Sequence, residues 1–320
     1  MSSLTIRQLR YFEALARHRH FGRAAEACAI SQPALSIQMK ELEALLGAPL
    51  IERGARQLRL SDLGEALAGR ARDILRAVDE IEDMARAAHG PFSGRLRIGV
   101  IPTVAPYLLP GLIQRLAGAY PDLDILPRET VTPTLIRDLL DGRLDLAVVA
   151  LPTSEPTLHE EPLFQEEFVL VRPEADAGQP VPDAEHLREM RLLLLEEGHC
   201  FRDQALSFCN LSASPPRDLM EGSSLATLVQ MVGVGIGVTL IPEMAVAVET
   251  ASAPVSVARL GAPRPTRTIG MVWRKSTPLA PQLARIAERV RAFGREGETG
   301  EARTAETPTP GTRTPKPPPA

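Results

Sequence analysis

Cysteine is scarce in this sequence, with only Cys28, Cys200 and Cys209 among 320 residues. Three cysteines exclude the disulfide framework of a small secreted domain. No stretch approaches 18 apolar residues, so no transmembrane helix is expected, and the first residues lack the apolar segment of a secretory signal. We therefore expect a cytoplasmic protein without membrane contact, in which a disulfide would be transient rather than structural.

Signatures of enzymes and metalloproteins are also missing. The C-terminal part has no Gly-x-Ser-x-Gly motif, and the sequence predicts no catalytic residues, no metal site and no cofactor. Its 44% apolar and 24% charged residues are ordinary for a globular protein. A chain of this length can form more than one domain with its own core.

Charge is distributed unevenly along the chain. The total is −4, yet residues 1–61 carry a net charge of +4. The nine basic residues of this segment are Arg7, Arg10, Arg17, Arg19, Arg23, Lys40, Arg53, Arg56 and Arg59. A basic head on an acidic body favours a polyanionic partner for the head alone.

The head has the pattern of a winged helix-turn-helix. Apolar residues recur at helical spacing over 6–18, 21–28 and 31–46, with Ser31 as a cap and Gly47 as a stop. The inward stripe of the third helix is predicted to hold Leu35, Met39, Leu42 and Leu46. Segments 50–53 and 57–60 flank a glycine turn, which predicts a β-hairpin wing. We assign residues 1–61 to this DNA-binding domain.

One long helix is predicted over 62–89. Apolar residues follow a seven-residue repeat: Leu67, Ala71, Ile74, Val78, Ile81, Ala85 and Ala88. This spacing is typical of a coiled-coil seam over about three heptads. We therefore expect a linker helix that forms a dimer, the alternative being a helix packed on its own domain.

Beyond a Gly- and Pro-containing break at 90–94, strands alternate with helices. Strands are expected at 96–101, 123–129 and 144–151, with helices at 106–119 and 133–141 between them. Further apolar stretches at 168–171, 192–195 and 238–241 precede a late strand at 269–273 and a closing helix at 279–293. The pattern predicts an α/β regulatory domain of two Rossmann-like lobes over 90–295, resembling periplasmic binding proteins. Residues 296–320 are expected to form a disordered tail.

Four segments of the head resemble the N-terminal signature of LysR-type transcriptional regulators. They are Gln8-Leu9-Arg10-Tyr11-Phe12, Phe21-Gly22-Arg23-Ala24-Ala25, Ser31-Gln32-Pro33-Ala34-Leu35-Ser36 and Leu42-Glu43-Ala44-Leu45-Leu46-Gly47. Order and spacing match over about 60 residues, which is far more specific than a generic helix-turn-helix. The resemblance implies a transcription regulator with a winged head, a coiled-coil linker and a two-lobed effector domain.

The expected DNA contacts follow from helix geometry. If the apolar stripe of the third helix faces inward, Pro33, Ser36, Ile37 and Lys40 face outward. Ser36 and Ile37 can reach base edges, and Lys40 can bind a phosphate. Gln32 can contact adenine or the backbone, whereas Arg53 and Arg56 on the wing suit phosphates or the minor groove. The partner of this head is therefore predicted to be double-stranded DNA.

The two later cysteines lie nine positions apart in different settings. Cys200 directly follows His199 and stands two positions before Arg202. A positive charge on either side chain could lower the pKa of the Cys200 thiol. Cys209 has no adjacent cation, so the pair is asymmetric in the way that an attacking and a resolving thiol should be. Cys28 is instead expected to be a buried structural residue.

Helix geometry sets a condition on any bond between these two thiols. In a continuous helix their Cα atoms would be roughly 13–14 Å apart and on opposite sides of the axis. A disulfide needs Cα atoms within about 7 Å. We therefore expect oxidation to refold this segment and to move the dimer interface and the DNA-binding heads.

Residues 101–110, 198–209 and 267–270 resemble the peroxide-sensing members of the LysR-type family. The resemblance implies that hydrogen peroxide, as signal molecule, oxidises Cys200 and that Cys209 resolves the product to a disulfide. Thr103 and Thr132 would polarise the peroxide, with support from Arg267 and Asp203. A tetramer, RNA polymerase and a thiol reductant are further implied partners. Leu219 and the stretch 222–226 depart from the pattern of those members, which puts peroxide coordination from that side in doubt.

Three other functions remain open at this point. The chain could be a LysR-type regulator whose cleft binds a small metabolite, with the cysteines incidental. A thiol peroxidase would need rapid turnover, and a DNA-binding head is unusual on an enzyme. A solute-binding protein would fit the two lobes but not the head.

Overall fold

The fold is that of a computed structural model, which describes residues 4–52, 58–88, 94–208 and 220–301. The chain divides into two compact units. The first unit comprises Met1–Gly99, Leu116–Ala147 and Trp273–Ala280, and the second comprises Val100–Arg115, Val148–Val272 and Pro281–Ala320. Each unit is described by itself.

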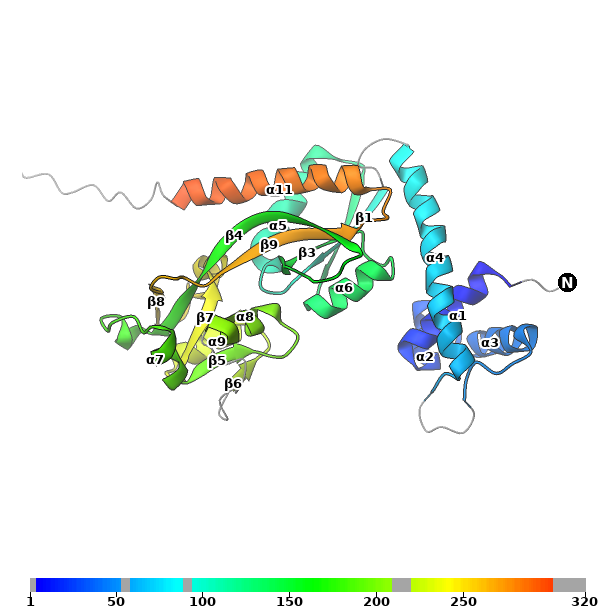
Figure 1. Cartoon of the computed structure of the whole chain (residues 1–320), viewed down its shortest axis with the longest axis horizontal. Coiled ribbons are helices and arrows are strands. Elements are labelled where there is room, and N and C mark those ends of the chain that lie inside the picture. Colours follow the sequence, from blue (N-terminus) through cyan, green and yellow to red (C-terminus); the bar gives the residue numbers. More distant parts are fainter. Residues whose placement is uncertain (1–3, 53–57, 89–93, 209–219, 302–320) are drawn as a thin grey trace, which may run out of the picture. The chain divides into compact units, whose positions relative to one another are not determined.

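Helices begin the first unit. They are α1 (Ile6–His18), α2 (Phe21–Ala27), α3 (Gln32–Leu46) and α4 (Asp62–Ala88). Figure 1 shows the first three gathered around the first turns of α4. Their shared core holds Phe12, Leu15, Leu35 and Leu42, all fully buried. Amphipathic helices of this kind are stabilised mainly by such packing.

The ends of α3 show why the chain turns where it does. Ser31 is the N-cap, and its hydroxyl accepts a hydrogen bond from the backbone of Ala34. Gly47 ends the helix in the left-handed conformation, with φ 71°, which glycine adopts without a steric penalty. Both signals were read correctly from the sequence.

The base of the expected wing is formed by two antiparallel segments. Ile51 and Leu60 make a β-bridge, and the backbone of Glu52 donates to the carbonyl of Arg59 at 3.0 Å. The tip, residues 53–57, lies outside the described residues, and so do Arg53 and Arg56. The described flanks agree with a hairpin at this position.

The α/β portion of the first unit adds strands and a further helix. These elements are β1 (Gly94–Val100), β2 (Leu123–Glu129), α6 (Thr132–Leu140), the end of α5 (Ala105–Ala119) and the start of β3 (Leu146–Leu151). The strand order here is β2-β1-β3. Fully buried Asp145 ties the strands together by accepting from the backbone amide and the guanidinium of Arg97.

The second unit is built on a mixed sheet with the order β9-β4-β7-β5-β6, and β8 pairs with β4. The strands are β4 (Leu158–Pro173), β5 (Leu192–Leu195), β6 (Met220–Gly222), β7 (Val238–Pro242), β8 (Val255–Arg259) and β9 (Thr266–Arg274). Strand β4 runs antiparallel to β7 and β8, whereas β5 is parallel to β6 and β7. Strands β4 and β9 run side by side although about a hundred residues separate them (Figure 1).

The second unit also contains several helices, some of which contribute to the core beside the sheet. The helices are η1 (Glu174–Asp176), α7 (Ala184–Glu189), α8 (Cys200–Phe208), α9 (Leu225–Gly233), η2 (Glu243–Ala245), α10 (Val246–Glu249) and α11 (Ala280–Glu301). The core combines Leu170 and Leu193 of the strands with Phe201 of α8 and Val229 of α9.

The predicted fold class, a helical DNA-binding head followed by a two-lobed α/β regulatory part, is confirmed. Three local details differ from the expectations. Leu46 is exposed rather than inward, because it occupies the last turn of α3, beyond the end of the core. Ile6, in the first turn of α1, is exposed too. Helix α11 continues to Glu301, so residues 296–301 are helical rather than part of a tail.

None of the described helices is both long enough and apolar enough to cross a membrane.

Candidate redox site and DNA-binding face

Cys200 is the first residue of α8, immediately after the loop that leaves β5. Gly198 makes the turn with a φ of 94°, in the region that favours glycine. The backbone amide of Glu196 donates to the carbonyl of Gly222, which extends the parallel pairing of β5 and β6 into the loop. The cysteine therefore lies beyond the carboxyl end of a parallel strand, where α/β folds place their functional groups.

Cys200 is accessible and lies near a helix N-terminus. It is a free, half-buried thiol in the first turn of α8. The unpaired amides and the dipole at a helix N-terminus stabilise a negative charge and activate a thiol. Asp203, also in this first turn, is exposed to solvent. Its part in supporting the thiolate stays a prediction.

Cys28 offers the opposite environment. It follows α2 and packs against the core of the helical head. Burial raises the pKa of its thiol, and the Glu13 carboxylate raises it further. A thiol whose ionisation is disfavoured is a poor nucleophile, so Cys28 is suited to packing rather than to redox chemistry.

His199 contributes differently from the sequence-based expectation. Its side chain is buried, and burial lowers the pKa of the imidazole from its ordinary value. The imidazole is therefore neutral at pH 7 and brings no positive charge to the neighbouring thiol. Support of the thiolate by His199 stays a prediction, limited to hydrogen bonding from a neutral ring.

Arg202 is buried and already paired. Its Nη1 donates to the carbonyl oxygen of Leu195 at 3.0 Å and lies 2.6 Å from Oε1 of Glu221. This guanidinium holds the end of β5 and the start of β6 against the first turn of α8. The structure thus gives Arg202 a role in fixing the helix that carries Cys200.

Phe201 connects α8 to a second buried arginine. The ring centroids of Phe201 and Phe168 are 4.7 Å apart in a tilted arrangement. The Arg267 guanidinium carbon lies 5.4 Å from the centroid of the Phe201 ring. This is within the range of a cation–π interaction, which is strong where water is excluded.

Arg267 also joins Thr103 to Glu166. Its Nη1 donates to the Thr103 hydroxyl at 2.8 Å, and its Nη2 donates to the Thr103 carbonyl at 3.1 Å. Its Nε donates to Oε1 of Glu166 at 2.7 Å, and Nη2 lies 2.6 Å from the same oxygen. All three residues are buried. Thr103 and Arg267, two residues predicted to support the site, are thus in direct contact.

Thr132 belongs to the first unit, where it begins α6. Its hydroxyl oxygen is buried and has no hydrogen-bond partner among the described residues. The N-cap of this helix, Val131, offers no side-chain hydrogen bond either. A buried, unpaired hydroxyl is a costly arrangement that is often retained for function.

Two expected features lie outside the described residues, namely Cys209 and Leu219. The altered stretch 222–226 is described. Gly222 ends β6, and Ser224 caps α9 by accepting from the backbone of Thr227. The departure from the family pattern therefore still builds a well-capped helix.

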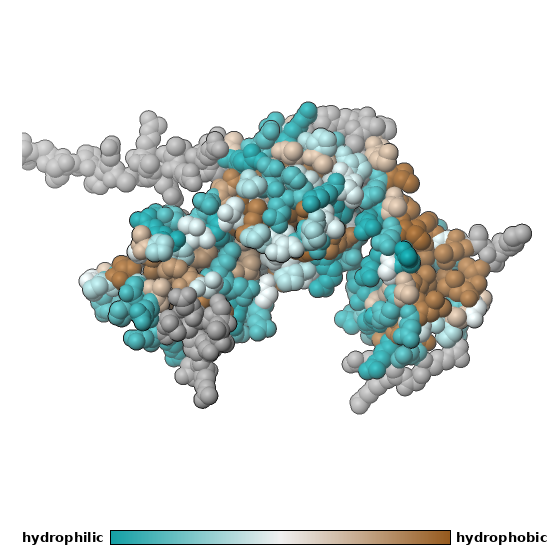
Figure 2. Space-filling view, viewed as in Figure 1, coloured by the Kyte–Doolittle hydropathy of each residue, from teal (hydrophilic) through white to brown (hydrophobic). Residues whose placement is uncertain are grey.

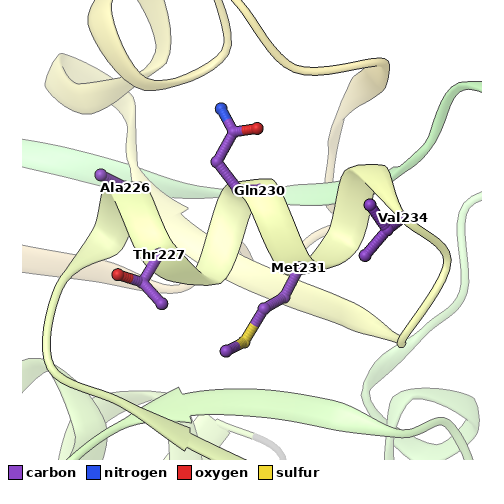
Figure 3. A pocket seen from close by; sticks show the side chains of 5 residues that line it. All are labelled: Ala226, Thr227, Gln230, Met231 and Val234. Carbon is purple, nitrogen blue, oxygen red and sulfur yellow. The ribbon is translucent and has the colours of Figure 1, made fainter.

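The outer face of α9 carries a shallow apolar hollow of about 490 Å³. Figure 3 shows its five lining side chains, which come from this helix and from the C-cap residue that follows it: Ala226, Thr227, Gln230, Met231 and Val234. Positions 226, 230 and 234 are spaced by four and share one stripe. Val234 is 74% exposed.

Two buried residues of the site were missed by sequence reasoning, Glu166 and Phe201. Glu166 and Phe168 are two positions apart on β4 and so share a face of the strand. That alternation could have placed a carboxylate in the core. Nothing in the sequence indicates that its partner is Arg267, about a hundred residues further on.

The predicted DNA-reading residues lie on one surface of α3. Gln32, Pro33, Ile37 and Lys40 are exposed, and Ser36 is half-buried. Ile37 is a large apolar side chain left open to solvent, which agrees with a role at a base edge. Their contact with DNA stays a prediction.

Helix α4 exposes part of its predicted seam. Ile74 and Ile81 are exposed, the latter by 66%, and Met84 is exposed beside them. Figure 2 shows hydrophobic residues gathered over the region of α4 and the adjoining α1. In contrast Ala71, in the first half of the helix, is buried. Within the described ranges, no group of His, Cys, Asp or Glu could hold a metal ion.

Comparisons with known proteins support the assignment of both parts of the chain. The family model "Bacterial regulatory helix-turn-helix protein, lysR family" matches residues 6–65, and "LysR substrate binding domain" matches residues 89–295. Together these matches cover nearly all of the described chain.

Similar curated proteins extend over the same region. A probable hydrogen peroxide-inducible genes activator of Streptomyces viridosporus is 43% identical over 296 residues, which cover 91% of this chain and 95% of that protein. The DNA-binding transcriptional dual regulator OxyR of Escherichia coli is 41% identical over 293 residues, covering 90% and 95%.

Solved structures agree with these relatives. A full-length OxyR variant from Pseudomonas aeruginosa has a TM-score of 0.70 and 36% identity, covering 91% of this chain and 96% of its own. A mutant OxyR from Corynebacterium glutamicum with hydrogen peroxide bound has a TM-score of 0.64 and 33% identity, covering 98% and 99%. The chain therefore belongs to the LysR family of helix-turn-helix transcription regulators, a family of DNA-binding proteins rather than enzymes, and it is similar to OxyR.

Proposed function

We propose that this protein is a cytoplasmic transcription regulator of oxidative-stress genes that senses hydrogen peroxide through Cys200. The observation that carries the proposal is the setting of this thiol. It lies at the N-terminus of α8, next to Phe201, whose ring meets an Arg267 that also binds Thr103. The similarity to proteins named as peroxide-inducible activators and to an OxyR with bound peroxide supports the same signal.

The proposed chemistry begins with the Cys200 thiolate. Its sulfur attacks one peroxide oxygen, an S–O bond forms as the O–O bond breaks, and the cysteine becomes a sulfenic acid. The second oxygen leaves as hydroxide, which takes a proton to become water. The Cys209 thiol then attacks the sulfenic sulfur, water leaves, and a Cys200–Cys209 disulfide remains. Reduction would need a cellular thiol reductant.

The described helix makes this disulfide a structural switch. Cys200 and Phe208 are the two ends of α8, so their Cα atoms are about 12 Å apart at the standard rise. Residue 209 follows directly, and consecutive Cα atoms are about 3.8 Å apart. While α8 remains intact, the two cysteine Cα atoms therefore stay at least about 8 Å apart. A disulfide requires about 7 Å or less, so α8 must unwind for the bond to form.

Unwinding α8 would disturb buried contacts. Phe201, Ala205 and Leu206 belong to the core of the second unit, and Arg202 ties α8 to β5 and β6. Because these contacts are lost, formation of the disulfide would change the packing of the rest of the regulatory part. The output is a change in the arrangement of the DNA-binding heads.

We propose that the protein acts as an oligomer. The exposed seam of α4 suits a dimer, and the shallow apolar hollow on α9 suits a second contact within a tetramer. The domains we propose are a DNA-binding head (1–61), a linker helix (62–89), a redox-sensing regulatory domain (90–295) and a tail beyond it. RNA polymerase is the expected partner at promoters, where the protein acts as an activator.

The proposal is tested with Cys200→Ser, with Cys28→Ser as the matched control. The expected result is that Cys200→Ser loses peroxide-dependent transcription but retains DNA binding, whereas Cys28→Ser responds normally. An unaltered response of Cys200→Ser would instead favour a regulator whose cleft binds a small metabolite. Peroxide consumption well beyond one equivalent per subunit would favour a thiol peroxidase.

A further inference from the structure

The buried carboxylate of Glu166 has no part in the proposed chemistry so far. It lies on β4, and its side chain is buried together with Arg267 of β9. One of its oxygens, Oε1, accepts a hydrogen bond from Nε of that guanidinium and lies 2.6 Å from its Nη2. A side-on pair of this kind fixes the plane of the guanidinium and leaves Nη1 directed elsewhere.

The free end of the guanidinium determines what the Thr103 hydroxyl can do. Arginine has only donors, so the 2.8 Å contact from Nη1 makes the Thr103 oxygen the acceptor. The hydrogen of this hydroxyl must then point away from Arg267. No described residue accepts it, although Thr103 is only 2% exposed. The Thr103 hydroxyl is left as a buried donor without an acceptor.

We propose that Glu166 is a positioning residue that acts through Arg267 to present the Thr103 hydroxyl as a hydrogen-bond donor to a bound peroxide oxygen. The inference rests on the proposed function, because it assigns this donor to the peroxide that oxidises Cys200. The hydrogen bond would stabilise the oxygen that leaves as hydroxide when the O–O bond breaks.

Charge explains why a carboxylate is needed at position 166. A buried guanidinium without a counter-charge is strongly unfavourable, and it would turn toward any other acceptor within reach. Burial in turn raises the pKa of Glu166, against the opposing influence of Arg267, and nearby Glu243 raises it further. The second oxygen, Oε2, is buried and has no hydrogen-bond partner among the described residues. Arg267 is thus the side-chain partner of this carboxylate, and a backbone hydrogen bond from Met244 opposes the rise of its pKa as well.

A matched control lies next to it on the same strand. Glu167 pairs with Arg259 at 2.9 Å and with Arg264 at 3.0 Å, and these arginines are exposed. Glu167→Gln therefore removes a carboxylate of the same strand without touching Arg267 or Thr103.

The test compares two reagents on the full-length reduced protein. Hydrogen peroxide requires polarisation of its leaving oxygen, whereas iodoacetamide alkylates the same thiolate without that requirement. We expect Glu166→Gln to slow oxidation of Cys200 by peroxide about tenfold or more, with alkylation within about twofold of the wild type. Glu167→Gln should react like the wild type with both reagents.

A double-mutant cycle with Thr103→Val identifies the route. If Glu166 acts through Thr103, the double variant Glu166→Gln/Thr103→Val is no slower with peroxide than Thr103→Val alone. If Glu166→Gln does not fold, Glu166→Asp replaces it in the same measurements. This variant keeps the negative charge but moves it away from Arg267 by the length of one methylene. Partial retention of the peroxide rate by this variant is expected.

Several outcomes overturn the inference. They are an unchanged peroxide rate in Glu166→Gln, an equal loss with both reagents, or additive losses in the double variant. Each of these leaves the proposed function intact as long as wild-type Cys200 reacts with peroxide. A wild-type Cys200 that peroxide does not oxidise would overturn both the proposed function and the role of Glu166.

Discussion

The Arg267 guanidinium stands 5.4 Å from the centre of the Phe201 ring, and Phe201 directly follows Cys200 in the chain. Arg267 belongs to β9 and Phe201 to α8, so this contact holds the helix of Cys200 against a strand that lies more than sixty residues later in the sequence. Arg267 thus connects the residue that follows Cys200 to the Thr103 hydroxyl, and Phe201 belongs to the core of the second unit.

Truncation of Phe201 should destabilise the protein strongly. The side chain is buried against Phe168, and Phe→Ala substitutions in a core cost about 3–5 kcal/mol. Phe201→Leu keeps most of the volume and removes the contact with Arg267, which is worth about 0.5–2 kcal/mol. Urea unfolding measures both. The control is Phe208→Ala at the half-buried end of α8, and equal losses at 201 and 208 would contradict the packing described above.

Stability should fall in mild acid because of His199. Burial lowers the pKa of His199 below its ordinary 6.5, so the folded state binds this proton less readily than the unfolded state. The stabilisation is therefore fully present above about pH 6.5 and is lost as the pH falls toward the lowered folded value. His199→Asn should flatten this dependence in thermal unfolding between pH 5 and 7.

A second histidine provides a control of opposite sign. Asp183 raises the pKa of exposed His186 by a hydrogen bond and by its charge. Its contribution is present below the ordinary pKa and is lost as the pH rises through the raised value. His186→Asn should therefore not remove the loss of stability in acid, and a flattened profile in that variant would argue against His199 as its source.

The exposed seam of α4 should hold the dimer together. Ile81 is 66% exposed in the single chain, and Ile81→Glu replaces this apolar side chain by a charged one. Because the charge would be buried in the dimer interface, the variant should shift the protein toward monomers. Arg72→Glu lies on the same helix, on the side opposite Ile81 and exposed, and should leave the oligomeric state unchanged. Sedimentation velocity separates these outcomes. A dimer that survives Ile81→Glu undiminished would contradict an interface on this seam.

Lys40 should contribute to DNA affinity through a phosphate. Lys40→Ala is expected to weaken binding about equally on different sequences and to reduce the salt slope by about one. Ile37→Ala is expected instead to change the preference among sequences, because its side chain suits a thymine methyl. Fluorescence anisotropy over a range of salt concentrations tests both. A sequence-selective loss for Lys40→Ala would reassign that residue to base reading.

Most helix and strand bounds could be predicted from residues that are close together in the sequence. Ser31 and Gly47 marked the ends of α3 because caps are set by neighbouring residues, and the bounds of β5 followed from a short apolar run. The exposure of Leu46 could not be seen in the same way, because helical spacing says nothing about where the opposing core ends.

Long-range contacts decided the rest of the site. His199 was expected to support the thiolate as a cation because it is adjacent to Cys200 in the sequence. Burial, which the sequence does not reveal, lowers the pKa of this imidazole and favours its neutral form. Arg202 was expected to support the thiolate, which stays a prediction, and its pairing with Glu221 could not be foreseen from the sequence. The Glu166–Arg267 pair spans two strands, and no periodicity specifies such a partnership.

The central claim is that peroxide joins Cys200 to Cys209 by unwinding α8, and peptide-resolved mass spectrometry with deuterium exchange tests it most directly. Reduced protein is treated with one equivalent of hydrogen peroxide, and thiol state and exchange are measured in the same sample. The account predicts a peptide linked through Cys200 and Cys209, together with faster exchange across residues 200–208. Two free thiols after treatment, or a disulfide with unchanged exchange in α8, would contradict it.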